Sequence, residues 1–196
     1  MTSQTQYWNR LIQPGIVALV GAGGKTTVLS KLVEYGRLQG QPIVVTTTTQ
    51  LYESQVAQYE PIYTKDINDV DEYCTKRIQQ GYCGAWFNGI TRTKVDAVDC
   101  ESIDGLSALH PNWQIVVEAD GAKEKWLKAP KHTEPVIPSQ TKTTIGVVNL
   151  QMLGASLDED HVHNLELVQS IVHREEGAIV TPHMLAQIVL HKQGLF

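Results

Sequence analysis

The chain of 196 residues has few cysteines, and their positions exclude two classes of small protein. Cys74, Cys83 and Cys100 are odd in number and irregularly spaced. This pattern fits neither a disulfide framework nor a zinc site built from paired ligands. We interpret the three residues as reduced thiols that fill half-buried positions.

Long hydrophobic runs and an excess of positive charge are absent as well. The apolar stretch 16–20 is far shorter than the roughly 20 residues that cross a bilayer, and residues 1–11 lack a signal-peptide pattern. Sixteen Lys and Arg against 21 Asp and Glu give a net charge of −5, which does not favour binding to the negatively charged backbone of a nucleic acid. We therefore expect a cytoplasmic protein with no membrane or nucleic-acid partner.

The remaining composition is that of an ordinary globular protein, with 42% hydrophobic and 19% charged residues. A chain of this length buries roughly 70% of its unfolded surface, which suits a single domain over residues 1–196. Apolar runs alternate with helical patterns. Strands are predicted at 16–20, 43–49, 113–120, 144–150 and 178–180, and a strand or hairpin at 85–95. Helices are predicted at 25–39, 68–80, 102–109, 159–172 and from Thr181 onward. Asn68 is the expected N-cap of the helix at 68–80. This order predicts an α/β fold with three layers and a mainly parallel sheet, whose ligands bind beyond the carboxyl ends of the strands. The glycine-rich loop described next makes the expected three-layer domain P-loop NTPase-like.

A glycine-rich loop follows the first predicted strand and opens the first predicted helix. Its residues are Gly21, Ala22, Gly23, Gly24, Lys25, Thr26 and Thr27. Glycines let successive backbone N–H groups converge on phosphate oxygens, Lys25 can bridge the β- and γ-phosphates, and Thr26 can ligate Mg²⁺. The loop therefore predicts a site for ATP or GTP with Mg²⁺, and leaves the base undetermined. The alternative is a glycine-rich turn with an incidental Lys-Thr pair.

The loop is shorter than the common G-x-x-x-x-G-K-[ST] motif, because Leu19 stands where the first glycine would be. Its form G-x-x-G-K-T-T resembles the ATP loop of Mur ligases and folylpolyglutamate synthetases. That resemblance implies nucleotide binding and leaves a ligase reaction open.

Polar residues at two other strand ends are candidates for the same site. Thr46–Thr49 end the second strand, and Thr47 and Thr48 are the residues we expect near Mg²⁺ or the γ-phosphate, unless the run is only a β-branched strand end. Glu118 and Asp120 share one face of a later strand because side chains alternate along it. Together with Lys25 they are our candidate catalytic residues, and with Thr26 our candidate metal ligands. Which acid does which task stays open.

Four lysines follow in a loop with several Gly and Pro residues: Lys123, Lys125, Lys128 and Lys131. We predict that they form a local positive surface over the phosphate site, where an anionic small-molecule substrate binds. An ordinary solvated loop is the alternative. His161 and His163 are expected to cap or pack near Asp158, with a substrate contact as second choice and a shared metal ion as a less favoured one.

The motifs together resemble the YqeC family. They lie at 21–27, 46–49, 118–123, 127–130, 134–138 and 161–163, in the family's order. That family is described as an accessory of selenium-dependent molybdenum hydroxylases. The resemblance implies an NTP-dependent step in making or inserting a selenium-containing molybdenum cofactor, with a cofactor precursor and the hydroxylase machinery as partners.

Two departures from the family pattern limit this implication. Family members usually continue beyond residue 196 with a segment that could help to recognise the base, so the resemblance implies a C-terminally shortened chain. Arg is the more common residue where Asn164 follows the second histidine. The leading hypothesis is Mg²⁺-dependent NTP hydrolysis or phosphoryl transfer. The alternatives are a Mur-like ATP-dependent ligase and a nucleotide-gated carrier or scaffold with negligible turnover.

Overall fold

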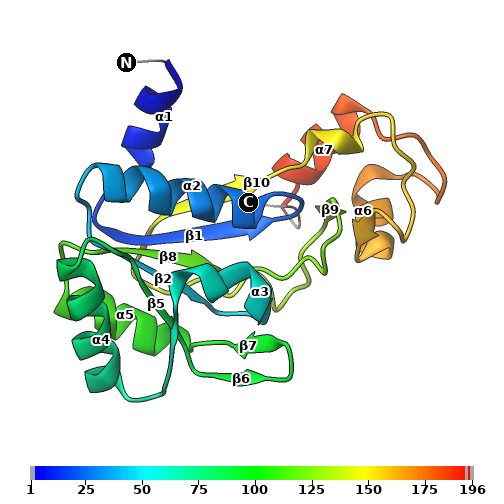
Figure 1. Ribbon diagram of the computed structural model, residues 1–196. Helices are drawn as coiled ribbons and strands as arrows, with labels where there is room; N and C mark the ends of the chain where they lie inside the picture. Colours follow the sequence, from blue (N-terminus) through cyan, green and yellow to red (C-terminus); the bar gives the residue numbers. More distant parts are fainter. Residues whose placement is uncertain (1–2, 193, 195–196) are drawn as a thin grey trace.

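The structure is a computed structural model that describes residues 3–192 and 194, with side chains from Tyr7 onward (Figure 1). Its centre is a six-stranded sheet in which every neighbouring pair of strands runs parallel. In spatial order the strands are β10 (Thr141–Val147), β1 (Gly15–Gly21), β8 (Gln114–Glu118), β2 (Ile43–Thr47), β5 (Gly84–Phe87) and β4 (Ile62–Tyr63). The expected mainly parallel α/β sheet is confirmed.

Alternating side chains of the central strands feed two separate cores, one on each face. Val17, Leu19 and Val116 pack with Leu29 and Leu32 of α2 (Lys25–Leu38), and residues of α1 (Ser3–Leu11) lie against the same core. The neighbouring residues on these strands point to the opposite face, which is covered by α4 (Ile67–Gln79) and α5 (Cys100–Leu109). Helices therefore lie on both faces of the sheet, as the three-layer prediction requires (Figure 1).

A third core holds the C-terminal part of the chain together as a smaller lobe. This lobe contains η2 (Leu150–Met152), β11 (Val162–His163), α6 (Leu165–Val172) and α7 (Pro182–Leu190), and β11 pairs with β9 (Leu127–Lys128). It lies beyond the ends to which the arrows of β1 and β8 point (Figure 1). The C-terminal lobe is thus placed next to the edge of the sheet where ligands of such folds bind.

A small antiparallel sheet lies beside the second strand. It consists of β3 (Leu51–Tyr52), β7 (Lys94–Asp96) and β6 (Gly89–Thr91), and β3 leads into α3 (Glu53–Val56) and η1 (Ala57–Tyr59). The predicted strand or hairpin at 85–95 is therefore β5 followed by a β6–β7 hairpin.

Three local predictions were wrong. The N-cap of α4 is Asp66, whose carboxylate accepts from the Asn68 amide, so the helix begins one residue before Asn68. The helix expected at 159–172 begins only at Leu165, because the preceding residues form β11 against β9. The expected strand at 178–180 makes only an isolated bridge between Ser156 and Ile179.

The cysteines and the expected absence of membrane segments can be compared with the structure. All three thiols are free; Cys74 and Cys83 are buried and Cys100 is partly exposed. Burial raises the pKa of the Cys74 thiol to about 12. Among the described residues, no helix combines the length and the apolarity needed to cross a membrane.

Candidate functional site

The glycine-rich loop lies between β1 and α2 at the carboxyl edge of the sheet. Gly21, Gly23 and Gly24 have positive φ angles of 97°, 66° and 142°. In the described part of the chain, the backbone N–H groups of residues 23–27 donate no hydrogen bond to a protein acceptor. The first turn of α2 therefore presents unpaired donors together with the positive end of the helix dipole, which is the arrangement that binds phosphate.

Close packing around Gly23 holds this loop in place. A Cβ atom at Gly23 would lie 2.5 Å from Cβ of Asn149 and 2.9 Å from the carbonyl oxygen of Trp126. The Ala22 amide donates to the carbonyl of Val147 at the end of β10 (3.1 Å). Glycine is thus required at position 23 by both the space and the backbone conformation.

Lys25 and Glu118 form a buried pair at the centre of the site. Lys25 Nζ donates to the carbonyl of Gly21 (2.6 Å) and lies 3.6 Å from Glu118 Oε1. Burial lowers the pKa of Lys25, partly opposed by the charge of Glu118, and burial raises the pKa of Glu118. An anion beside Lys25, or a cation beside Glu118, would therefore stabilise the charged form of that residue.

A second buried ion cluster, the Lys128 cluster, consists of Asp120, Lys128 and Glu134. Lys128 Nζ donates to Asp120 Oδ1, to the carbonyl of Gly121 (2.7 Å) and to Glu134 Oε2 (2.8 Å). Asp120 Oδ2 accepts from the Gly21 amide (3.1 Å). Asp120 therefore ties the start of the glycine-rich loop to the loop that carries Glu134, and its oxygens are already engaged.

The loop opens into a cavity of about 580 Å³, which we call the phosphate cavity. Of the predicted site residues, Gly23, Gly24, Lys25, Thr26, Glu118, Lys123 and Lys125 line it. Gly21, Ala22, Thr27, Thr47, Thr48, Asp120, Lys128 and Lys131 are not among its lining residues. The structure thus separates the two candidate acids, since Glu118 faces the cavity and Asp120 lies in the Lys128 cluster.

The threonines at the end of β2 are used mainly for internal hydrogen bonds. Thr47 Oγ1 donates to the carbonyl of Glu118 (2.8 Å), and Thr48 Oγ1 donates to the carbonyl of Val136. Thr49, the last residue of the run, lines the phosphate cavity. A ligand contact of Thr47 or Thr48 stays a prediction, and the structure brings Thr49 closer to such a role.

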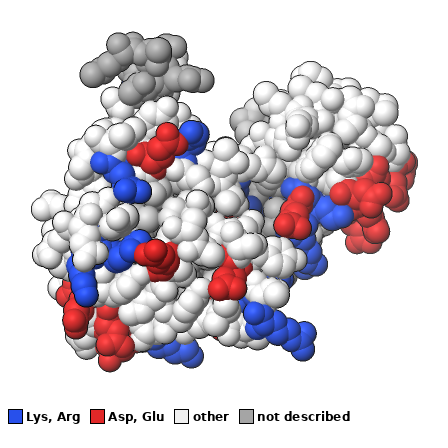
Figure 2. Space-filling model, in the orientation of Figure 1, with Lys and Arg blue, Asp and Glu red and all other residues white. Residues whose placement is uncertain are grey.

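Lys128 does not belong to the positive surface that we predicted for the four lysines. Its side chain is fully buried in the Lys128 cluster, because β9 places it against the acids of two neighbouring loops. Lys123 and Lys125 line the phosphate cavity and also a larger groove of about 1500 Å³, which Lys131 lines as well. Lys and acidic side chains gather where the C-terminal lobe meets the rest of the molecule (Figure 2).

The two histidines have different surroundings. His161 packs against Trp126 with ring centroids 4.8 Å apart, and its Nδ1 lies 2.6 Å from Asp158 Oδ1, which agrees with the expected capping and packing role. His163 lines both the phosphate cavity and the larger groove. Burial, together with the charges of Lys128 and Lys123, lowers the pKa of His163, which favours its neutral imidazole.

Metal binding can be judged from the oxygen groups at the cavity. Within the described ranges 3–192 and 194, no group of three or more His, Cys, Asp or Glu side chains is arranged to hold a metal ion. Thr26 and Glu118 both line the phosphate cavity, and hydroxyl and carboxylate oxygens suit Mg²⁺, which commonly keeps waters and phosphate oxygens as further ligands. These two residues fit such an ion, whereas the oxygens of Asp120 are engaged by Lys128 and Gly21.

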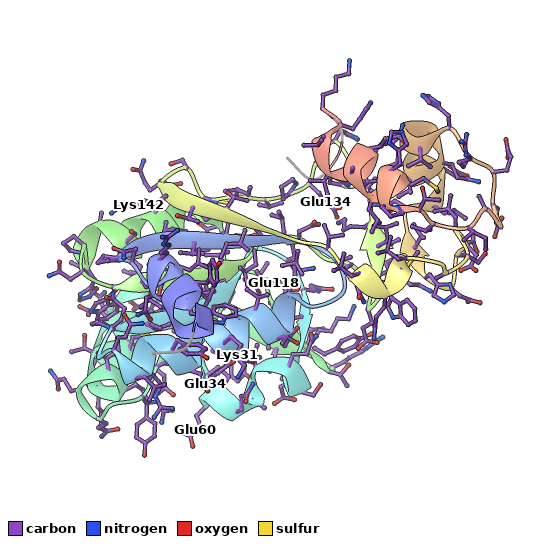
Figure 3. All side chains as sticks on the ribbon, turned by 90° about the horizontal axis from the view of Figure 1, so that it is seen from above. Lys31, Glu34, Glu60, Glu118, Glu134 and Lys142 are labelled. Carbon is purple, nitrogen blue, oxygen red and sulfur yellow. The ribbon has the colours of Figure 1, made fainter. Side chains whose placement is uncertain are left out.

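Sequence reasoning missed several residues of the cavity. Gln55 donates to Thr26 Oγ1 (3.2 Å), Asn149 packs against Gly23, and Glu134 lines the wall shared with the larger groove. Glu118 and Glu134 come from different parts of the chain, and Glu134 lies nearer the C-terminal lobe (Figure 3). For Asn149 a signal existed, since it is a polar residue near the end of the predicted strand 144–150, and Glu134 belongs to the motif at 134–138. Gln55 reaches the site only through tertiary packing.

The fold and the site define an α/β protein with a three-layer parallel-sheet architecture, whose candidate site lies at a glycine-rich strand-to-helix loop. The chain belongs to the YqeC family, since the family model described as YqeC protein matches residues 17–166. It is also similar to the protein of Escherichia coli (strain K12) described as "Uncharacterized protein YqeC", with 29% identity over 185 residues that cover 94% of this chain and 71% of that protein. No solved structure matches the chain significantly.

Proposed function

We propose that this chain binds ATP or GTP with Mg²⁺ and catalyses NTP hydrolysis or transfer of the γ-phosphoryl group to an anionic small molecule. The observation that carries the proposal is the run of unpaired backbone N–H groups at 23–27, next to the buried Lys25–Glu118 pair. A triphosphate would supply acceptors for these donors and a counter-charge for the lysine.

Four residues at the glycine-rich loop then have defined tasks. Lys25 exchanges the carbonyl of Gly21 for phosphate oxygens, which stabilises its charged form. Thr26 and Glu118 would hold Mg²⁺ or its water ligands, and the bound ion would supply positive charge opposite the phosphate oxygens. Asp120 acts indirectly: its carboxylate accepts a hydrogen bond from the Gly21 amide and so holds the start of the glycine-rich loop in place.

The biological step that we propose is a contribution to the maturation of a selenium-containing molybdenum cofactor for hydroxylases. Membership of the YqeC family supports this proposal through the role described for that family. The lysines Lys123 and Lys125, which line the phosphate cavity, would suit a phosphorylated cofactor precursor.

A thermal-shift screen of ATP, GTP and CTP with Mg²⁺ tests binding and base preference together. At a ligand concentration of 100 Kd, binding stabilises the folded state by about 2.7 kcal/mol. Lys25→Ala should remove this stabilisation, whereas Lys31→Ala, on the exposed side of the same helix, should retain it. An unchanged nucleotide response of a folded Lys25→Ala protein, verified by circular dichroism, would refute the proposal.

Turnover separates the proposed activity from its alternatives. Glu118→Gln should keep nucleotide binding and lose Mg²⁺-dependent phosphate release. Phosphate release that requires both a carboxylate and an amine would indicate a ligase instead. Binding without turnover, even with the hydroxylase machinery present, would indicate a nucleotide-gated carrier.

A further inference from the structure

The larger groove, which we call the lobe groove, lies between the C-terminal lobe and the residues that follow β8. Its volume of about 1500 Å³ exceeds that of the phosphate cavity. Residues of α6 form one side, and the segment from Lys123 to Ile137 contributes to the other. The groove is therefore large enough for an organic molecule as well as its first hydration shell.

Three cations of the lobe groove lack a carboxylate partner. In the described part of the chain, Lys123, Lys125 and Lys131 form no ion pair, and Lys125 Nζ instead donates to the carbonyl of Asp160 (3.1 Å). Glu134, which lies on the same wall, is bonded to Lys128. Burial would raise the pKa of Glu134, but the hydrogen bond and charge of Lys128 outweigh this effect and lower it. The wall formed by Lys123, Lys125 and Lys131 thus presents positive charge to the groove, whereas the acids Glu159, Glu166 and Glu176 lie on the lobe side.

The opposite side of the lobe groove is mixed in character. Leu165, Leu167 and Ile171 of α6 line it, and Leu167 is 38% exposed. Glu159, Glu166 and Glu176 also line the groove and belong to the lobe side. Apolar side chains here can cover a hydrophobic ring or chain, whereas the acids disfavour a second anionic group at this end.

The wall between the two cavities is shared. Lys123, Lys125, Glu134 and His163 line both the lobe groove and the phosphate cavity. Lys123 and the following Glu124 have φ angles of 47° and 61°, a left-handed conformation that non-glycine residues rarely adopt. The strained pair turns the chain at the point where the cavities meet. A molecule in the groove would therefore have its anionic end beside the phosphate cavity.

We propose that the lobe groove binds a small organic molecule that carries a phosphate group at one end and an apolar body at the other. The phosphate contacts Lys123, Lys125 and Lys131, and the apolar body lies along α6 at Leu167. That this molecule accepts the γ-phosphoryl group rests on the proposed function. Its binding in the lobe groove does not depend on that function. The proposal thus names a site and a chemical class for the second substrate.

Titration calorimetry with 1-naphthyl phosphate tests this site, since the probe combines one phosphate with an apolar ring system. We expect binding of one molecule per chain, tighter than that of 1-naphthol or inorganic phosphate. Lys131→Gln should weaken it roughly tenfold, because the lost contact is a charge-assisted hydrogen bond. Leu167→Gln should weaken it several-fold, and Lys65→Gln, an exposed lysine that lines neither cavity, should leave it unchanged.

The same titration in the presence of nucleotide distinguishes the two proposals. Saturating Mg²⁺ with ATP or GTP should not displace 1-naphthyl phosphate, and Lys25→Ala should still bind it. Displacement by nucleotide, or loss in Lys25→Ala, would place the probe in the phosphate cavity and overturn the separate site. No binding, or binding insensitive to both Lys131→Gln and Leu167→Gln, would overturn it as well. If nucleotides fail to stabilise the protein but the probe binds as expected, only the proposed function fails.

Discussion

Replacement of Lys128 by methionine is the sharpest test of the structure, because it leaves buried acids without their counter-charge. Lys128 is fully buried and Asp120 is 2% exposed, so neither charge can recover its lost interaction from water. Removal of one partner from such a pair typically costs about 3–5 kcal/mol. Glu134 keeps some contact with solvent and Asp120 keeps the Gly21 amide, so we expect the lower end, about 3 kcal/mol.

Equilibrium unfolding in urea, followed by tryptophan fluorescence and circular dichroism, measures this loss. A loss of about 3 kcal/mol corresponds to a decrease in Tm of roughly 6–12 °C for a chain of this size. Lys65→Met is the matched control and should change stability by no more than about 0.5 kcal/mol.

A double-mutant cycle separates the stranded charge from lost packing. Lys128→Met combined with Asp120→Asn should be more stable than Lys128→Met alone, because the buried carboxylate is gone while an amide oxygen still accepts from Gly21. A loss below about 1 kcal/mol for Lys128→Met, or additive effects in the double variant, would show that Lys128 is not held in a buried ion cluster.

Two further predictions concern the loop and the acid at the shared wall. Gly23→Ala should lower the free energy of unfolding by about 1–3 kcal/mol, because Gly23 has a φ of 66° and a Cβ atom there would clash with Asn149. It should also abolish nucleotide-induced thermal stabilisation. A variant as stable as the parent would contradict the assigned loop conformation. Glu134 has a folded-state pKa below its usual 4.5, so it contributes stability above pH 4.5 that is lost as the pH falls towards the folded-state pKa. Urea unfolding midpoints measured from pH 6 to pH 3 should therefore fall less steeply for Glu134→Gln than for the parent. Equal slopes for the two proteins would contradict the contact between Glu134 and Lys128.

The parts of the fold that were predictable from sequence are those whose signals are local. The apolar run before Gly21, the helical spacing after Lys25 and the Thr181-Pro182 start of a helix each depend on a few adjacent residues. The same holds for the position of Glu118 at a strand end. In each case propensity, burial and turn chemistry favour the same structure, so short-range reasoning sufficed.

The parts that were not predictable depend on partners far apart in the chain. Lys128 resembles any other loop lysine until β9 pairs with β11 and brings it to Asp120 and Glu134. Likewise, the choice between Glu118 and Asp120 depends on which buried lysine each acid pairs with. Glu118 lies beside Lys25 of the glycine-rich loop, whereas Asp120 is hydrogen-bonded to Lys128. Thr49 rather than Thr47 or Thr48 lines the cavity because the two earlier hydroxyls bond to carbonyls of other segments.

The strand order has a consequence for how the protein matures on the ribosome. β1 is synthesised first among the sheet strands, yet its two neighbours are β8 and β10, which end at Glu118 and Val147. At typical translation speeds of roughly 5–20 residues per second, β1 waits on the order of ten seconds for both edges to be filled. During that interval the nascent chain lacks the Asp120 and Val147 contacts that hold its glycine-rich loop, so this loop reaches its final conformation only late in translation.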